Sequence, residues 1–106
     1  MARLIMIPNY PIYVIAEPDV YVFFSLDAVQ KHVEHYDVDD GIYVGFDTDG
    51  FELDFISKNG EIFVHRCAHQ KWHKMIDLIT KCMLAHGLDT SGKDVLQLAR
   101  ERFTRS

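Results

Sequence analysis

The sequence predicts an α+β fold in which an antiparallel β-sheet, built as a meander, packs against two or three helices. Apolar and polar residues alternate between residues 42 and 66, which is the pattern of strands with one buried face. After about residue 69 the apolar residues recur at helical spacing. Asp-Gly at 49–50 and Asn-Gly at 59–60 separate the strand-like runs, as they do in tight hairpins.

Length and composition fit one globular domain over residues 1–106. The chain is 48% hydrophobic and 25% charged, which are ordinary values. Its two cysteines are too few for the disulfide framework of a secreted protein, so we expect free thiols in a reducing cytoplasm. Residues 1–18 are apolar, but Pro8 and Pro11 interrupt them, which disfavours a targeting segment or a membrane-spanning helix. We therefore predict a cytoplasmic protein with no membrane partner.

The N-terminal third predicts two strands and a helix. Residues 12–16 and 20–24 are rich in β-branched and aromatic side chains. Pro11 and Pro18 bracket the first run, so we expect it at the edge of the sheet. Ser25 is the expected N-cap of a helix of about three turns. Its apolar stripe would be Leu26, Val29, Val33 and Tyr36.

The rest of the chain predicts a three-stranded meander and two helices. The strands are residues 42–47, 51–56 and 61–66. A helix with Met75 and Met83 on its apolar side would end near Gly87, and Asp89, Thr90 or Ser91 would cap the last helix. The side chains expected to be largely buried are Phe46, Phe51 or Leu53, Phe55, Val64, Trp72, Ile76 and Ile79.

Negative charge is concentrated in the middle of the chain. Residues 1–35 hold four acids and two bases, giving −2, whereas residues 36–56 hold seven acids and no base, giving −7. Residues 57–106 hold five acids and nine bases, giving +4. The net charge of −5 disfavours direct nucleic-acid binding, which depends on a surplus of Lys and Arg. An uncompensated acidic segment instead favours a basic protein partner.

We predict that this acidic segment is the partner-binding surface. Its carboxylates fall on turns and outward strand positions, while Phe51, Leu53 and Phe55 face the core. The predicted interface comprises Asp37, Asp39, Asp40, Tyr43, Asp47, Asp49, Glu52 and Asp54. A calcium site is disfavoured because Gly45 and Ile56 occupy positions where an EF-hand needs acids, and turn chemistry explains the Asp-Gly pairs.

A second group of residues has the chemistry of metal ligands. His65 and Cys67 would share a strand face, and His69 and His73 would lie four residues apart on a helix. Their spacing matches no standard zinc motif, so we favour a structural junction and predict no metal or other cofactor. The sequence contains no phosphate-binding glycine loop and no serine elbow, so we predict no catalytic residues and no enzyme activity.

Residues 22–55 carry a family resemblance. An aromatic strand is followed by a Ser-started helix, then by "YDVDDGIY" and by Asp-x-Asp-Gly-x-x-Leu at 47–53. This layout resembles small immunity proteins of bacterial toxin–immunity systems, including contact-dependent growth inhibition. The resemblance implies a non-catalytic protein that binds the C-terminal domain of one cognate toxin, often a nuclease, and occludes its active site or substrate surface. A small metal-binding or ligand-sensing module centred on residues 65–73 is the alternative.

Overall fold

The computed structural model describes residues 7–106, so expectations about residues 1–6 lie outside the described part. Within this part the chain forms a six-stranded sheet and four helices, which confirms the α+β class. The elements are β1 (Ile12–Ala16), β2 (Asp19–Phe23), α1 (Leu26–His32), α2 (His35–Asp39), β3 (Val44–Phe46), β4 (Phe51–Lys58), β5 (Glu61–Gln70), α3 (Trp72–Ala85), α4 (Val95–Phe103) and β6 (Thr104–Arg105).

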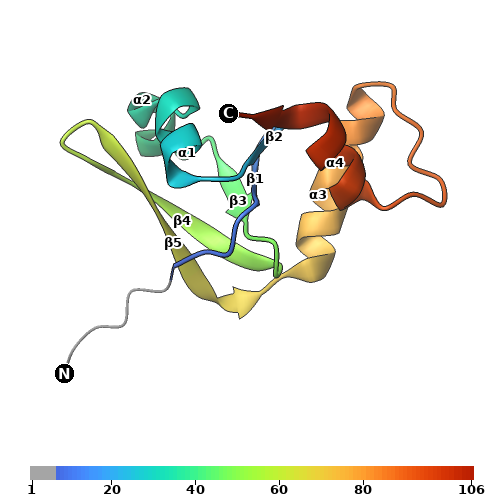
Figure 1. The fold of residues 1–106 in the computed structure, drawn as a ribbon, viewed down its shortest axis with the longest axis horizontal. Helices are drawn as coiled ribbons and strands as arrows, with labels where there is room; N and C mark the ends of the chain where they lie inside the picture. The colour runs from blue at the N-terminus through green and yellow to red at the C-terminus, as the bar shows by residue number, and fades with distance from the viewer. Residues whose placement is uncertain (1–6) are drawn as a thin grey trace.

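The sheet is covered by helices on both faces. Its strand order is β5-β4-β3-β1-β2-β6, and all neighbours are antiparallel except β2 and β6. On one face Ile12 and Val14 pack with residues of α1, and on the other Tyr13 and Ile15 pack with residues of α3 and α4. Figure 1 shows the two helix pairs on opposite sides of the central strands. The period-2 alternation of β1 thus divides the core into two clusters.

Strand β1 lies in the middle of the sheet, so the prediction of an edge strand is wrong. It pairs with β2 on one side and with β3 on the other, and Tyr13 lies opposite both Val22 and Phe46. Pro11 and Pro18 flank the strand without entering it, so every residue of Ile12–Ala16 keeps an N–H group for the ladder.

The expected three-turn helix is two short helices. Ser25 is the N-cap, as predicted, and its hydroxyl accepts a hydrogen bond from the N–H of Ala28 at 3.1 Å. Val33 and Glu34 adopt extended backbone, with ψ of 122° and 134°, and they separate α1 from α2. Val33 is buried, but Tyr36 is 67% exposed, so its predicted place on a buried stripe is wrong.

The meander of β3, β4 and β5 is confirmed, but β5 is longer than predicted. It continues to Gln70, where the N–H of Lys71 donates to the carbonyl of Gly50 at 2.7 Å and α3 begins at Trp72. Trp72 packs against Gly50 and stays 41% exposed, so its predicted burial is wrong. Of the other predicted core residues, Phe46, Leu53, Val64 and Ile79 are buried, whereas Phe51, Phe55 and Ile76 are half-buried.

The last helix begins later than the sequence indicated. Gly87, with φ of 75°, follows α3 as expected, but α4 is capped by Asp94 rather than by Asp89, Thr90 or Ser91. The Asp94 carboxylate accepts hydrogen bonds from the N–H groups of Leu96 and Gln97 at 3.0 and 3.3 Å. All four residues are polar cap formers, so propensity alone did not distinguish them.

Close packing of β3 against β4 yields a first prediction. A Cβ on Gly45 would lie 2.5 Å from the ring of Phe55, so Gly45→Ala should lower the free energy of unfolding by about 1 to 3 kcal/mol through overpacking. Chemical denaturation measures this loss. Phe55→Leu removes the ring, and in that background the same Gly45→Ala change should cost clearly less. Equal costs in both backgrounds would contradict the steric explanation.

Candidate partner-binding surface

Helix α2 and the turn after it present the exposed part of the acidic segment. The side chains of Asp39 and Asp40 are exposed, and neither forms a hydrogen bond or an ion pair with another side chain of residues 7–106. Glu34, just before the helix, is exposed as well. Residues 34–42 contain four acids and no Lys or Arg. These carboxylates are free to meet cationic groups of another molecule.

The local fold explains why this short helix is held in place. Gly41 has φ of 69° and follows Asp40, and the N–H groups of Gly41 and Ile42 donate to the carbonyls of Val38 and Asp37 at 3.0 and 3.1 Å. This is a Schellman motif, which satisfies the last carbonyls of the helix. The Tyr43 hydroxyl also donates to the Asp37 carboxylate at 3.2 Å, which joins the helix to the chain leading into β3.

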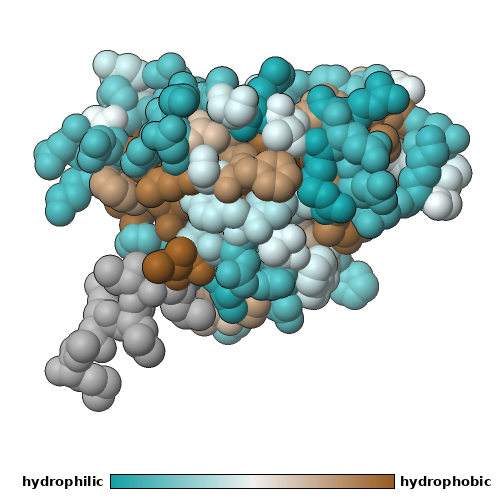
Figure 2. Space-filling model, in the orientation of Figure 1, coloured by the Kyte–Doolittle hydropathy of each residue, from teal (hydrophilic) through white to brown (hydrophobic). Residues whose placement is uncertain are grey.

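Apolar side chains lie beside these acids. Tyr36 is 67% exposed and Ile42 is 48% exposed, and both flank the Asp39–Asp40 pair in sequence. Figure 2 shows mainly hydrophilic residues over α2 and a more apolar area below it, over the β4–β5 hairpin. The sequence did not indicate Tyr36 as a surface residue, because no Gly or Pro marks the break at residues 33–34. It placed Ile42 in a strand over 42–47, but β3 begins only at Val44.

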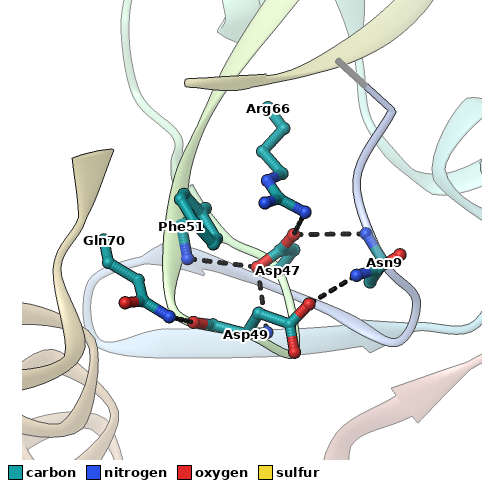
Figure 3. A network of polar contacts seen from close by, with 6 residues as sticks. All are labelled: Asn9, Asp47, Asp49, Phe51, Arg66 and Gln70. Carbon is teal, nitrogen blue, oxygen red and sulfur yellow. Dashed lines mark hydrogen bonds and ion pairs between the residues drawn. The ribbon is translucent and has the colours of Figure 1, made fainter. Parts of the chain in front are cut away.

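Asp47 is fully buried, so its predicted place on an exposed surface is wrong. One carboxylate oxygen accepts hydrogen bonds from the N–H groups of Asp49 and Phe51 at 2.9 and 3.1 Å. The other accepts from the N–H of Asn9 at 3.2 Å and lies 3.8 Å from a guanidinium nitrogen of Arg66. Figure 3 shows Asp47 at the centre of this network. Aspartate at the start of a turn readily bonds the backbone that follows it, which is why the carboxylate points inward.

Three further acids of the predicted interface have internal partners. Asp49 accepts a hydrogen bond from the side-chain amide of Asn9, and Gln70 donates to the Asp49 carbonyl at 2.7 Å. Glu52 is paired with the ammonium group of Lys74 at 2.6 Å, and Asp37 is bonded to Tyr43 as described above. The predicted interface residues therefore do not form one free surface. The β3–β4 turn also lies beside Trp72 at the start of α3, away from α2 (Figure 1).

The four residues with the chemistry of metal ligands, His65, Cys67, His69 and His73, are not arranged as the sequence suggested. His69 lies in β5, and α3 starts only at Trp72, so His69 and His73 are not four residues apart on one helix. Among residues 7–106 no three His, Cys, Asp or Glu side chains converge in a way that would hold a metal ion. Both cysteines are free thiols, as expected.

The Cys67 thiol lies in an acidic environment. Burial raises its pKa, and the negative charges of Asp54 and Glu52 raise the pKa further. Asp54 itself is exposed and lies opposite His65 in the β4–β5 ladder. The thiol is therefore protonated at neutral pH, which opposes a role as nucleophile because the thiolate is the reactive form.

Comparisons with protein-family models, with curated proteins and with solved structures gave no match. No helix within residues 7–106 has the length and apolar character needed to span a membrane.

The Asp47 network yields a second prediction. In Asp47→Asn an NH2 group, which cannot accept, replaces one of the two carboxylate oxygens. Hydrogen-bond donors face both oxygen positions, so either orientation of the amide leaves donors unsatisfied. We expect the free energy of unfolding to fall by about 2 to 4 kcal/mol. Asp49→Asn is the matched control, because its amide can keep an oxygen toward Asn9. Equal losses for the two variants, measured by chemical denaturation, would contradict a special role for Asp47.

The environment of Cys67 yields a third prediction. Asp54→Asn removes the negative charge that acts most strongly on Cys67 and should lower the pKa of its thiol. The pH dependence of iodoacetamide alkylation, followed by mass spectrometry on the peptide with Cys67, should therefore shift to lower pH. Cys82 is 1% exposed and serves as the slowly reacting internal reference. An unchanged alkylation profile would show that Asp54 does not act on the thiol.

Proposed function

We propose that this protein is an immunity protein that binds and neutralises a cognate bacterial toxin domain through the surface of α2 and its following turn. The observation that carries the proposal is the exposed carboxylate pair of Asp39 and Asp40, without internal partners among residues 7–106, beside exposed Tyr36 and Ile42. The α2 surface, as we name it, comprises Glu34, Tyr36, Asp39, Asp40 and Ile42. It replaces the wider acidic interface that the sequence suggested.

The composition of the α2 surface suits a protein interface. Aromatic and aliphatic side chains provide most of the binding energy at interfaces, while surrounding charges guide the encounter and select the partner. Tyr36 and Ile42 supply the aromatic and aliphatic contacts, and the carboxylates of Glu34, Asp39 and Asp40 supply the charges. Within residues 7–106 these acids form no ion pair that would have to be broken before a partner binds, so their charge acts on an approaching cationic surface.

The charge of the surface indicates the chemistry of the partner. Grooves that bind nucleic acid are lined by Lys and Arg, because phosphate recognition depends on them. A nuclease toxin has such a groove, and an inhibitor with exposed carboxylates can occupy it and exclude the substrate. Occlusion of this kind requires no catalytic residue in the inhibitor, in agreement with the family resemblance of residues 22–55.

The direct test is protection of cells. Co-expression of this protein with the toxin domain encoded beside its gene should prevent killing, and the purified pair should form a stable complex. Failure of the wild-type protein to protect cells and to bind that domain would overturn the proposal.

The α2 surface yields a fourth prediction. Asp39→Asn with Asp40→Asn should slow association with the toxin domain several-fold and flatten its dependence on salt, because exposed charges act mainly on the encounter rate. Tyr36→Ala should instead speed dissociation, with a loss of about 1 to 2 kcal/mol if the ring is a buried anchor. Stopped-flow kinetics at low and high salt separate the two effects.

The matched control removes the same charge elsewhere. Asp77→Asn with Glu101→Gln changes two exposed acids on α3 and α4, on the opposite side of the sheet from α2. These variants should associate at nearly the wild-type rate. If the control pair slows association as much as Asp39→Asn with Asp40→Asn, binding responds to net charge and the α2 surface is not the interface.

A further inference from the structure

A small cavity opens where the end of α1 meets strands β2 and β6. Its volume is about 120 Å³. An apolar cavity of about 150 Å³ in another protein holds one benzene molecule, so this cavity is of the size that takes a single small ring. The lining residues are Tyr21, Phe23, His32, Val33, Tyr43 and Arg105.

Four of the six lining residues are aromatic, and three of their rings stack on one another. Phe23 is fully buried, and its ring centroid lies 6.4 Å from that of Tyr21 and 6.0 Å from that of His32. The corresponding interplanar angles are 26° and 25°. These rings stack on one another, so the faces of Phe23 are already covered, and the three rings form one aromatic wall whose outer rings are Tyr21 and His32. A flat ligand packs better against such a wall than a branched one.

The cavity is cationic although the protein as a whole is acidic. The guanidinium carbon of Arg105 lies 5.9 Å from the centroid of the Tyr21 ring, and Arg105 forms no ion pair within residues 7–106. None of the lining residues is an acid. The nearby Asp37 carboxylate is already bonded to the hydroxyl of Tyr43. Arg105 is therefore a cation at an aromatic site that is available to an anion.

Two polar side chains of the cavity, Tyr43 and His32, lie beside the place proposed for the anion. Burial raises the pKa of Tyr43, and the Asp37 carboxylate raises it further, so its hydroxyl stays protonated at neutral pH. The Nε2 atom of His32 lies 2.9 Å from the main-chain oxygen of Ser106, which holds the ring beside the cavity. The hydroxyl of Tyr43 places no negative charge where an anion would lie.

We propose that this cavity is a binding site for a small aromatic carboxylate. The ring of the ligand would lie against Tyr21 and His32, and its carboxylate would pair with the guanidinium of Arg105, whose two-pronged geometry matches a carboxylate. None of the five residues of the α2 surface lines the cavity, and the proposal does not depend on the function proposed for that surface.

Benzoate is the probe that tests this site. Titration of the isotope-labelled protein, followed by amide chemical shifts, should show saturable binding with millimolar affinity, with changes confined to β2, the end of α1 and β6. Benzamide has the same shape without the charge, and it should bind at least about tenfold more weakly, as expected for loss of a charge-assisted contact. Acetate has the charge without the ring and should bind as weakly as benzamide.

Substitutions locate the binding contact. Arg105→Gln should weaken benzoate binding about tenfold, whereas Arg102→Gln removes the same charge from an exposed position on α4 and should leave it unchanged. The amide spectrum of each variant shows whether the fold is retained. Equal binding of benzoate and benzamide by the wild type, shifts outside the cavity, or no shift at about 10 mM benzoate would overturn the proposal.

Discussion

The buried carboxylate of Asp47 is the constraint on which the arrangement of the sheet depends. It joins the segment before β1, the β3–β4 turn and strand β5 through the backbone of Asn9, the backbone of Phe51 and the guanidinium of Arg66. A buried charge is tolerated only when it is paired and hydrogen-bonded, and Asp47 meets both conditions. The guanidinium of Arg66 also lies 3.6 Å from the centroid of the Phe51 ring. Arg66 therefore contacts both the Asp47 carboxylate and the first residue of β4.

The same network determines how the third helix leaves the sheet. The turn fixed by Asp47 carries Gly50, whose carbonyl accepts from Lys71 and whose Cα faces the ring of Trp72. A side chain on Gly50 would collide with that ring, and its φ of 82° favours glycine as well. The junction between β5 and α3 is thus built on the β3–β4 turn, through Lys71 and Trp72.

Five of the seven acids of residues 36–56 consequently fall into two groups with different roles. Asp47, Asp49 and Glu52 hold elements of the fold together, whereas Asp39 at the end of α2 and Asp40 just after it are exposed to solvent. This division narrows the proposed interface to a small surface with its own apolar side chains. A change at Asp47 would act on stability, and a change at Asp39 would act on binding, so the two groups are separable by experiment.

The sequence by itself determined the α+β class, the meander of β3 to β5, the Ser25 cap and the end of α3 near Gly87, because periodicity, cap residues and Asp-Gly or Asn-Gly turns are local signals. Tertiary structure decided the central place of β1, since strand neighbours depend on contacts distant in sequence. It also decided which carboxylates are free. The sequence does not show whether the oxygens of an Asp in a turn face water or other parts of the protein. Asp47 contacts the backbone of Asn9 and the side chain of Arg66, which are 38 and 19 residues away in the sequence, and only the fold brings these groups together.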